Sequence, residues 1–324
     1  MGADRAWPSA VPVGAATGVG SMPGLDMAPS QARVLDVLAG LPHLVELPAR
    51  GPGADLIGRS AALLSGLPVD LQPAGWRLVP RPGRDLRRAQ DLLAGDLDAL
   101  AEAADGWSGP LKLQAAGPWT LAATLELARG DKALADPAAV ADIAASLAEG
   151  LSTHVAHVRS LVPAATLIVQ LDEPALPAVI RGQVPTASGF SVLPTPDEPD
   201  VVARLARVLT AVPFPGVHCC AARVPVTLLR SAGAGWVSLD LTLRQDEDAL
   251  GEALEAGTGL MLGVEKVSAA ADLERRLALA PQTWAAAVVL SPRCGLAEGS
   301  PESAIARLKA LTSAAARLAE DVLA

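Results

Sequence analysis

Short apolar runs alternate along the chain with longer stretches in which the apolar positions recur at helical spacing. Most of these short runs end in glycine, proline or a polar residue. This order predicts repeated strand–helix units, and therefore a parallel sheet rather than a sandwich. The expected strands span residues 17–21, 43–47, 111–115, 166–171, 216–220, 236–241, 260–264 and 286–290.

The expected helices are clearest in the second half of the chain. One is predicted over residues 200–212, because Val201, Leu205 and Val208 share one stripe at helical spacing. The last helix is expected to begin after Ser300, a good N-cap residue that is followed by proline. Further helices are expected over residues 29–39 and 246–255.

Eight expected strands with helices between them predict an α/β fold, a single (β/α)8 TIM-type barrel over residues 1–324. Its active site is expected at the C-terminal ends of the strands. The main alternative is an open, doubly wound sheet. Residues 18–21 read Gly-Val-Gly-Ser and lack the third glycine of a dinucleotide-binding motif. Hydrophobic residues make up 51% of the chain and aromatic residues only 2%, which suits strands buried on both faces.

The charge and the cysteine content narrow the classes of function. The formal net charge is −9 and no dense run of Lys and Arg occurs, so nucleic acid is not expected as a partner. No run approaches the ~18 apolar residues of a membrane span, and residues 10–19 lack the hydrophobic block of a signal peptide. Three cysteines do not make a disulfide framework in a chain of this size. We therefore expect a cytoplasmic protein without a membrane partner.

Distinctive polar residues recur at the ends of the expected strands. In a barrel, the C-terminal ends of all strands open onto one face, so these residues are expected to converge in one pocket. They are Ser21, Glu46, Asp172, His218, Cys220, Asp240 and Cys294.

The pattern His218-Cys219-Cys220 suggests a metal site. Alternate residues of a strand point to the same side, so His218 and Cys220 face one way and Cys219 the other. With Cys294 from a later strand end, they form a set of two thiols and an imidazole, which suits Zn²⁺. Asp240 is placed to supply a fourth ligand. The alternative is that buried cysteines are only small hydrophobic residues, which is our interpretation of Cys219.

The other histidines are expected to be structural. His154 and His157 lie in a helical stretch, and helices form the outer ring of a barrel. His43 begins an expected strand rather than ending one, which places it on the face opposite the active site.

The chain resembles the catalytic C-terminal barrel of the cobalamin-independent methionine synthase family, part of the uroporphyrinogen decarboxylase/methionine synthase-like barrel superfamily. The most specific matches are Asp-Glu-Pro-Ala at residues 172–175 and the set His218-x-Cys220 with Cys-Gly-Leu at residues 294–296. The matching segments occur in the family's order and span nearly the whole chain. The others are residues 18–23, Glu46, residues 117–118 and residues 170–171.

The resemblance implies a zinc enzyme that methylates homocysteine to methionine. It implies that Asp172 and Glu46 hold the amino group of homocysteine, and that the Ser21 loop lies near its carboxylate. The implied zinc ligands are His218, Cys220 and Cys294.

The sequence departs from the family's pattern in three places. The family's fourth zinc ligand is a glutamate, whereas Asp240 occupies the matching strand end. The family's usual enzymes carry an additional N-terminal barrel without a counterpart in these 324 residues. They also use a histidine after the seventh strand as an acid, but residues 263–268 contain none, which leaves Glu265 as a possible substitute.

The chemistry of the methyl donor follows from this last difference. An alkyl thiol is mostly protonated near neutral pH, and coordination to zinc would yield the reactive thiolate. The amine of methylfolate leaves only when protonated, whereas a corrinoid leaves without a proton. Methylfolate and a methylated corrinoid or corrinoid protein are therefore both kept as candidate donors.

Two other functions are kept as alternatives. One is a thiol alkyltransferase of the same superfamily with another thiol acceptor. The acidic pair Glu46 and Asp172 argues against this, because it favours an acceptor that carries an amine. The other is a non-catalytic barrel that binds zinc or a corrinoid.

Overall fold

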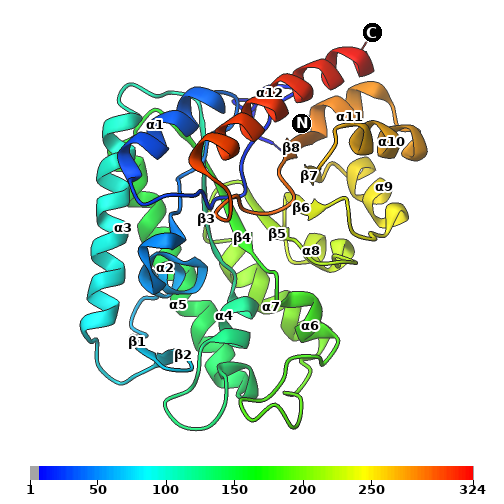
Figure 1. Ribbon diagram of the computed structural model, residues 1–324. Helices are drawn as coiled ribbons and strands as arrows, with labels where there is room; N and C mark the ends of the chain where they lie inside the picture. Colours follow the sequence, from blue (N-terminus) through cyan, green and yellow to red (C-terminus); the bar gives the residue numbers. More distant parts are fainter. Residues whose placement is uncertain (1–6, 324) are drawn as a thin grey trace.

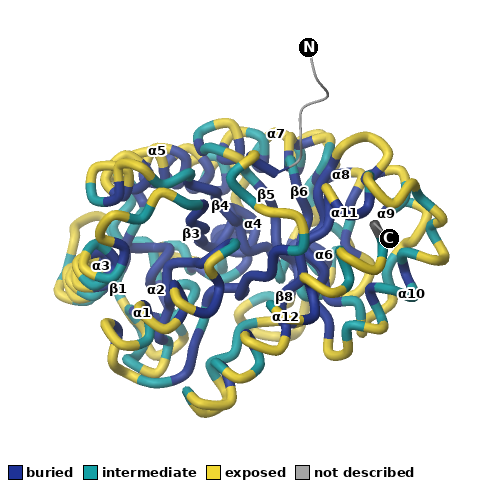
Figure 2. The backbone as a smooth tube through the Cα atoms, turned by 90° about the horizontal axis from the view of Figure 1, so that it is seen from above, coloured by how far each residue is buried: buried dark blue, intermediate teal, exposed yellow. Residues whose placement is uncertain are grey.

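The computed structural model describes residues 7–323, and its centre is a curled parallel sheet with helices around the outside (Figures 1 and 2). The strands are β1 Val69–Gln72, β2 Gly75–Leu78, β3 Pro110–Ala116, β4 Thr166–Asp172, β5 Pro215–Cys219, β6 Trp236–Asp240, β7 Gly259–Gly263 and β8 Val288–Ser291. The α-helices are α1 Met27–Val37, α2 Leu56–Ala61, α3 Arg84–Ala103, α4 Pro118–Thr124, α5 Pro137–Leu161, α6 Leu176–Ile180, α7 Glu198–Leu209, α8 Val226–Ser231, α9 Glu247–Glu255, α10 Ser268–Leu277, α11 Pro281–Ala287 and α12 Pro301–Leu323. Short 3-10 helices lie at η1 Pro48–Arg50, η2 Pro52–Ala54 and η3 Ala133–Ala135.

The central sheet has six parallel strands in the order β3-β4-β5-β6-β7-β8. Each strand pairs with the one that follows it along the chain, with helices in every connection. A doubly wound sheet reverses its strand order at a switch point, and this sheet does not. The predicted α/β fold with a parallel sheet is therefore confirmed, and the doubly wound alternative is wrong.

The first two expected strands are the main correction to the predicted elements. Over residues 17–21 and 43–47 the structure has isolated parallel bridges instead of regular strands. One reason is local: glycine weakens the interior of a strand, and residues 17–21 contain Gly18 and Gly20. The missing side chain at Gly18 also lets the His43 ring approach closely. The bridges join Ala16 to Leu290, Ser21 to Glu46, and His43 to Lys112.

The remaining boundaries differ by a few residues from the prediction. The expected strand over residues 286–290 begins too early, because α11 continues to Ala287. β5 ends at Cys219, so Cys220 is the first residue beyond the strand. Asp246 caps α9, since its carboxylate accepts a hydrogen bond from the Ala249 amide. The antiparallel β1–β2 hairpin was not predicted.

The inner face of the curled sheet has an apolar end and a polar end. Near the N-terminal ends of the strands, a buried cluster surrounds Trp236, whose ring stacks on Trp7 with a centroid distance of 4.9 Å. Polar side chains occupy the C-terminal ends. Between the sheet and the helices, the core consists mainly of Leu, Val, Ile and Ala. Among residues 7–323, no helix has both the length and the apolar character needed to cross a membrane.

Candidate metal centre

Strand register places His218 beside two polar residues of the neighbouring strands. Asp172 at the end of β4 pairs with His218 on β5, and His218 pairs with Ser238 on β6. The Nδ1 atom of His218 lies 2.8 Å from the Ser238 hydroxyl oxygen. The other ring nitrogen, Nε2, is buried and has no hydrogen-bond partner among residues 7–323. A buried polar atom without a partner is costly, so Nε2 is suited to a ligand that the protein itself does not supply.

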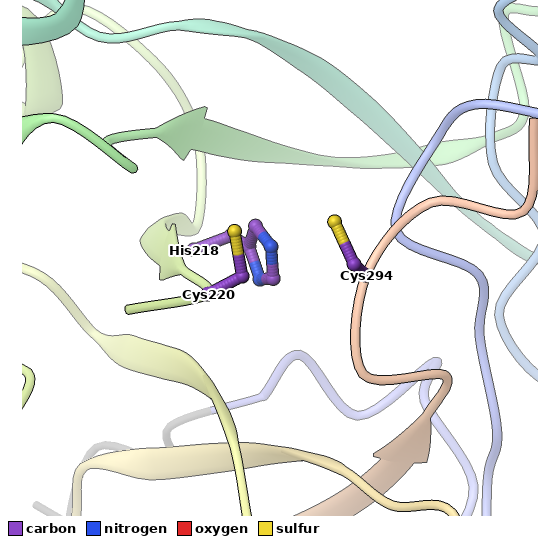
Figure 3. Close-up of side chains that lie close together, drawn as sticks. All are labelled: His218, Cys220 and Cys294. Atoms are coloured by element: carbon purple, nitrogen blue, oxygen red, sulfur yellow. The ribbon is translucent and has the colours of Figure 1, made fainter. Parts of the chain in front are cut away.

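Two cysteines form a cluster with His218. Cys220 directly follows β5, and Cys294 lies in the loop between β8 and α12 (Figure 3). The ligand atoms of His218, Cys220 and Cys294 all lie within 4.8 Å of one another. Two sulfur atoms and one imidazole nitrogen at this spacing fit a zinc ion. It is the one group of this kind found in the part of the chain that the structure describes.

The loop that carries Cys294 is fixed against the Ser21 segment. The Leu296 amide donates to the Ser21 carbonyl oxygen at 2.8 Å. Gly295 packs closely on Ser21, because a Cβ atom there would overlap the Ser21 hydroxyl unless that side chain turned away. The Cys-Gly-Leu sequence therefore holds the thiol of Cys294 toward the sheet.

The cluster changes the acidity of its thiols. Two neighbours lower the pKa of Cys294 to about 4. The larger effect is hydrogen bonding from Cys220, and the next is the interaction with the His218 ring. The same contact with Cys294 raises the pKa of Cys220. Cys219 is fully buried on the other side of β5, and this burial raises its pKa to about 12. The pair thus readily provides one thiolate, whereas Cys219 stays a neutral thiol.

Asp240 lies in the same region but outside this cluster. It ends β6, and its Oδ1 atom accepts hydrogen bonds from the Thr242 amide at 2.8 Å and the Thr242 hydroxyl at 2.7 Å. Asp240 is not part of the group whose ligand atoms lie within 4.8 Å of one another. Its role as a fourth ligand stays a prediction.

A cavity of about 310 Å³ opens beside the three candidate ligands and contains the two carboxylates expected to bind a substrate. Ser21, Glu46 and Asp172 line it. Burial raises the pKa of Glu46. Burial also raises the pKa of Asp172 well above its usual range, and the nearby charge of Glu46 adds to the rise. A cation such as an ammonium group that entered the cavity would favour the ionised form of both carboxylates.

A second, larger cavity of about 750 Å³ reaches the two cysteines from another side. It shares Ser21, Cys220 and Cys294 with the smaller cavity. Glu265, the proposed substitute acid, lines this larger cavity, is exposed, and pairs with Arg293 at 3.8 Å. The two thiols therefore lie where the two cavities meet.

Two buried cations, Arg59 and Lys112, lie near the two carboxylates. Nε of Arg59 lies 3.7 Å from Oε1 of Glu46, and Arg59 also pairs with the fully buried Asp96 of α3. Lys112 of β3 is fully buried near Asp172. Burial lowers its pKa to about 8, although the negative charges of Asp172 and Glu46 act to raise it. These groups offset the charge of the acidic pair.

Sequence reasoning missed Lys112 and Ser238. Lys112 could have been found, because a single lysine inside the apolar run of β3 is expected to be buried and to need polar partners. The sequence pattern indicated Ser238 less clearly. Alternation along β6 places it on the same side as Asp240, but only the strand register brings it to His218.

Glu173, the second residue of the Asp-Glu-Pro-Ala segment, has a structural role. Its carboxylate accepts hydrogen bonds from the amides of Trp119 and Thr120 at 2.9 and 2.7 Å, and from the Thr120 hydroxyl at 2.7 Å. A Cβ at Gly117 would overlap this carboxylate. Asp172 therefore faces the cavity, while Glu173 fixes the turn into α4.

Comparison with solved structures shows a similarity in fold. The structure is similar to that of a B12-independent methionine synthase from Shewanella sp. W3-18-1 in complex with selenomethionine, with a TM-score of 0.62 and 15% sequence identity. The match covers 96% of this chain and 99% of that chain. No protein-family model and no curated protein matches this chain. At this level of identity, the similarity shows a shared fold.

Proposed function

We propose that this protein is a zinc-dependent methyltransferase that activates homocysteine as a thiolate and converts it to methionine. The observation that carries the proposal is the cluster of His218, Cys220 and Cys294, in which the buried Nε2 atom of His218 has no hydrogen-bond partner among residues 7–323. The acidic cavity beside the cluster supports an amino-acid acceptor. The shared fold with a B12-independent methionine synthase agrees with this chemistry.

The proposed metal ligands are His218, Cys220 and Cys294, with Asp240 as a candidate fourth. Zinc bound there would lower the pKa of a substrate thiol, so that its sulfur is an anionic nucleophile. Ser238 would hold the His218 ring in the tautomer that leaves Nε2 free for the metal.

The acceptor would occupy the smaller cavity. Glu46 and Asp172 would bind its ammonium group through charge-assisted hydrogen bonds, and the Ser21 loop would lie near its carboxylate. The donor would approach from the larger cavity, which reaches the same two thiols. Methylfolate needs a proton at its leaving nitrogen, which Glu265 would have to supply, whereas a methylated corrinoid needs none.

The proposal also includes a complete eight-stranded barrel. Residues 16–21 and 43–46 would serve as the first two strands of a (β/α)8 barrel, linking β8 to β3 through their bridges. Under this proposal, residues 1–324 form a single catalytic barrel.

Metal analysis followed by a methyl-donor assay tests the proposal. The purified protein is expected to contain zinc, and Cys220→Ala is expected to lose it. Cys219→Ala is the matched control, because Cys219 is adjacent and buried but lies outside the cluster. Homocysteine is then incubated with methylcobalamin or with methylfolate, and methionine is measured.

Methionine formed from methylcobalamin alone supports the corrinoid donor, and methionine formed from methylfolate alone supports the folate donor with Glu265 as acid. Zinc binding that is equal in Cys220→Ala and wild type would reject the metal site. Intact zinc binding without methyl transfer from either donor would favour the non-catalytic alternative.

A further inference from the structure

Lys112 is a buried lysine whose donors are used inside the barrel. Its Nζ atom donates to the Val19 carbonyl oxygen and to Oε1 of Gln170, both at 2.8 Å. An ammonium group carries only donors, so it can contact the oxygen of the Gln170 amide but not its nitrogen. Lys112 therefore fixes which way this amide points.

The fixed amide determines the hydrogen bond that reaches Asp172. With Oε1 toward Lys112, the Nε2 atom of Gln170 donates to the Val19 carbonyl oxygen at 2.9 Å and to Oδ1 of Asp172 at 2.7 Å. In the opposite orientation, an amide oxygen would face the carboxylate, and an ionised carboxylate has no hydrogen to donate. Gln170 is fully buried, so water cannot easily replace the lost donor.

Asp172 is the last residue of this series and lines the acceptor cavity. Since its Oδ1 atom is held by Gln170, its rotation is restricted. We propose that Lys112 and Gln170 are positioning residues that orient Asp172 toward the amino group of the acceptor. They would thereby set the preference for thiols that carry an amine. This inference rests on the proposed function, because it takes an amino acid as the acceptor.

The variant Gln170→Glu separates positioning from stability. The new carboxylate would form an ion pair with Lys112, which keeps the buried lysine partnered. It cannot donate to Asp172, however, and places a second acid beside it. Lys112→Met tests the other end, since it removes the donors that orient the amide. Lys132→Met is the control, because Lys132 lies in the α4–α5 connection and contacts the Pro185 carbonyl oxygen.

The experiment measures the binding of two thiols to the zinc-loaded proteins by calorimetry. Homocysteine carries the amino group, and 4-mercaptobutyrate is the same thiol acid without it. In Gln170→Glu, homocysteine is expected to bind roughly tenfold more weakly or worse, because a hydrogen bond to a charged group is lost. Binding of 4-mercaptobutyrate is expected to change little, as is the binding of both thiols to Lys132→Met.

The outcomes distinguish this inference from the proposed function. If wild type binds neither thiol, the proposed function fails and the inference fails with it. If wild type prefers homocysteine and folded Gln170→Glu keeps the same preference, only the inference is overturned. Equal weakening of both thiols would also overturn it, because a merely structural role has that effect. If Lys112→Met does not fold, Gln170→Glu decides alone.

Discussion

Ser238 is expected to support the proposed metal site without being one of its ligands. It is fully buried and lies 2.8 Å from Nδ1 of His218. Loss of such a partner of a ligating histidine typically weakens metal binding about 10–100-fold. Ser238→Ala is therefore expected to lower zinc affinity in this range while the protein stays folded. Competition with a chromophoric chelator measures the affinity.

Ser231→Ala is the matched control for this prediction. Ser231 also makes a hydrogen bond, to the Thr227 carbonyl oxygen at 3.0 Å, but it is exposed on α8. Equal zinc affinity in Ser238→Ala and Ser231→Ala would show that the ring of His218 needs no support from β6.

His154 gives the protein a pH-dependent stability. It lies on α5, and burial lowers its pKa from 6.5 to about 3. In the unfolded chain the ring takes up a proton below its ordinary pKa, whereas in the folded protein it stays neutral until about pH 3. Acidification within this window therefore favours the unfolded state. Its contribution is fully present above pH 6.5 and is lost as the pH falls toward 3.

Urea unfolding at pH 7 and at pH 5 tests this effect. In His154→Gln, the free energy of unfolding should fall by about 2 kcal/mol less between these two pH values than in wild type. His157→Gln is the control, because His157 is an exposed histidine on the same helix. The same loss in wild type and His154→Gln would contradict the prediction.

The residues of the candidate metal centre could be predicted from the sequence, but most of the residues that surround and position them could not. Alternation along the expected strand over residues 216–220 predicted His218 and Cys220 on one side, and their ligand atoms do lie close together although Cys220 follows β5. The partners behind them depend on strand register and on long-range packing, neither of which can be derived from one sequence. Asp96 illustrates this limit, because its burial against Arg50 and Arg59 joins α3 to residues far away in the chain.

At the scale of elements, the approach of β5 to β6 depends on a glycine. A Cβ at Gly216 would overlap the indole ring of Trp236, which is fully buried and cannot easily move. Gly216→Ala is therefore expected to lower the free energy of unfolding by about 2–3 kcal/mol, as overpacked cores do. Urea unfolding measures this loss.

Gly95→Ala is the opposite case and serves as the control. Gly95 lies exposed in the middle of α3, and an added Cβ there meets nothing within 4 Å. Alanine should increase stability by about 0.5–1 kcal/mol, since glycine disfavours a helix. Both variants add the same methyl group, so the opposite signs isolate the contact with Trp236. A neutral Gly216→Ala would show that β5 and β6 can separate without cost.

Element prediction succeeded where local pattern and tertiary context agree. The helix α9 has a capping aspartate and a clear apolar stripe, and it lies where expected. At the start of β8, the sequence Ala285-Ala286-Ala287-Val288 is ambiguous, because alanine favours a helix and valine a strand. The first two expected strands have the apolar pattern but pair only at isolated residues, and the two glycines of the first, Gly18 and Gly20, disfavour a regular strand.

For the molecule as a whole, the fold separates stability from chemistry along the axis of the curled sheet. The C-terminal strand ends hold the candidate metal centre and both adjoining cavities. Toward the opposite ends, Trp7 stacks on Trp236 and its Nε1 atom donates to the Ala287 carbonyl oxygen at 2.8 Å. Sequential βα units predict this arrangement, because all parallel strands point the same way. The buried position of Trp7 was not predicted, because Trp7 lies outside every helix and strand expected from the sequence.

This separation predicts that changes to Trp7 alter stability without altering the site. Trp7 is buried, so Trp7→Ala should lower the free energy of unfolding by about 3–5 kcal/mol through the cavity that it leaves. Trp7→Phe keeps an aromatic ring but loses the hydrogen bond, and should cost about 1–2 kcal/mol. Under native conditions, both folded variants should bind zinc and homocysteine with wild-type affinity. A parallel loss of ligand affinity and stability across this series would show that the two ends of the curled sheet are coupled.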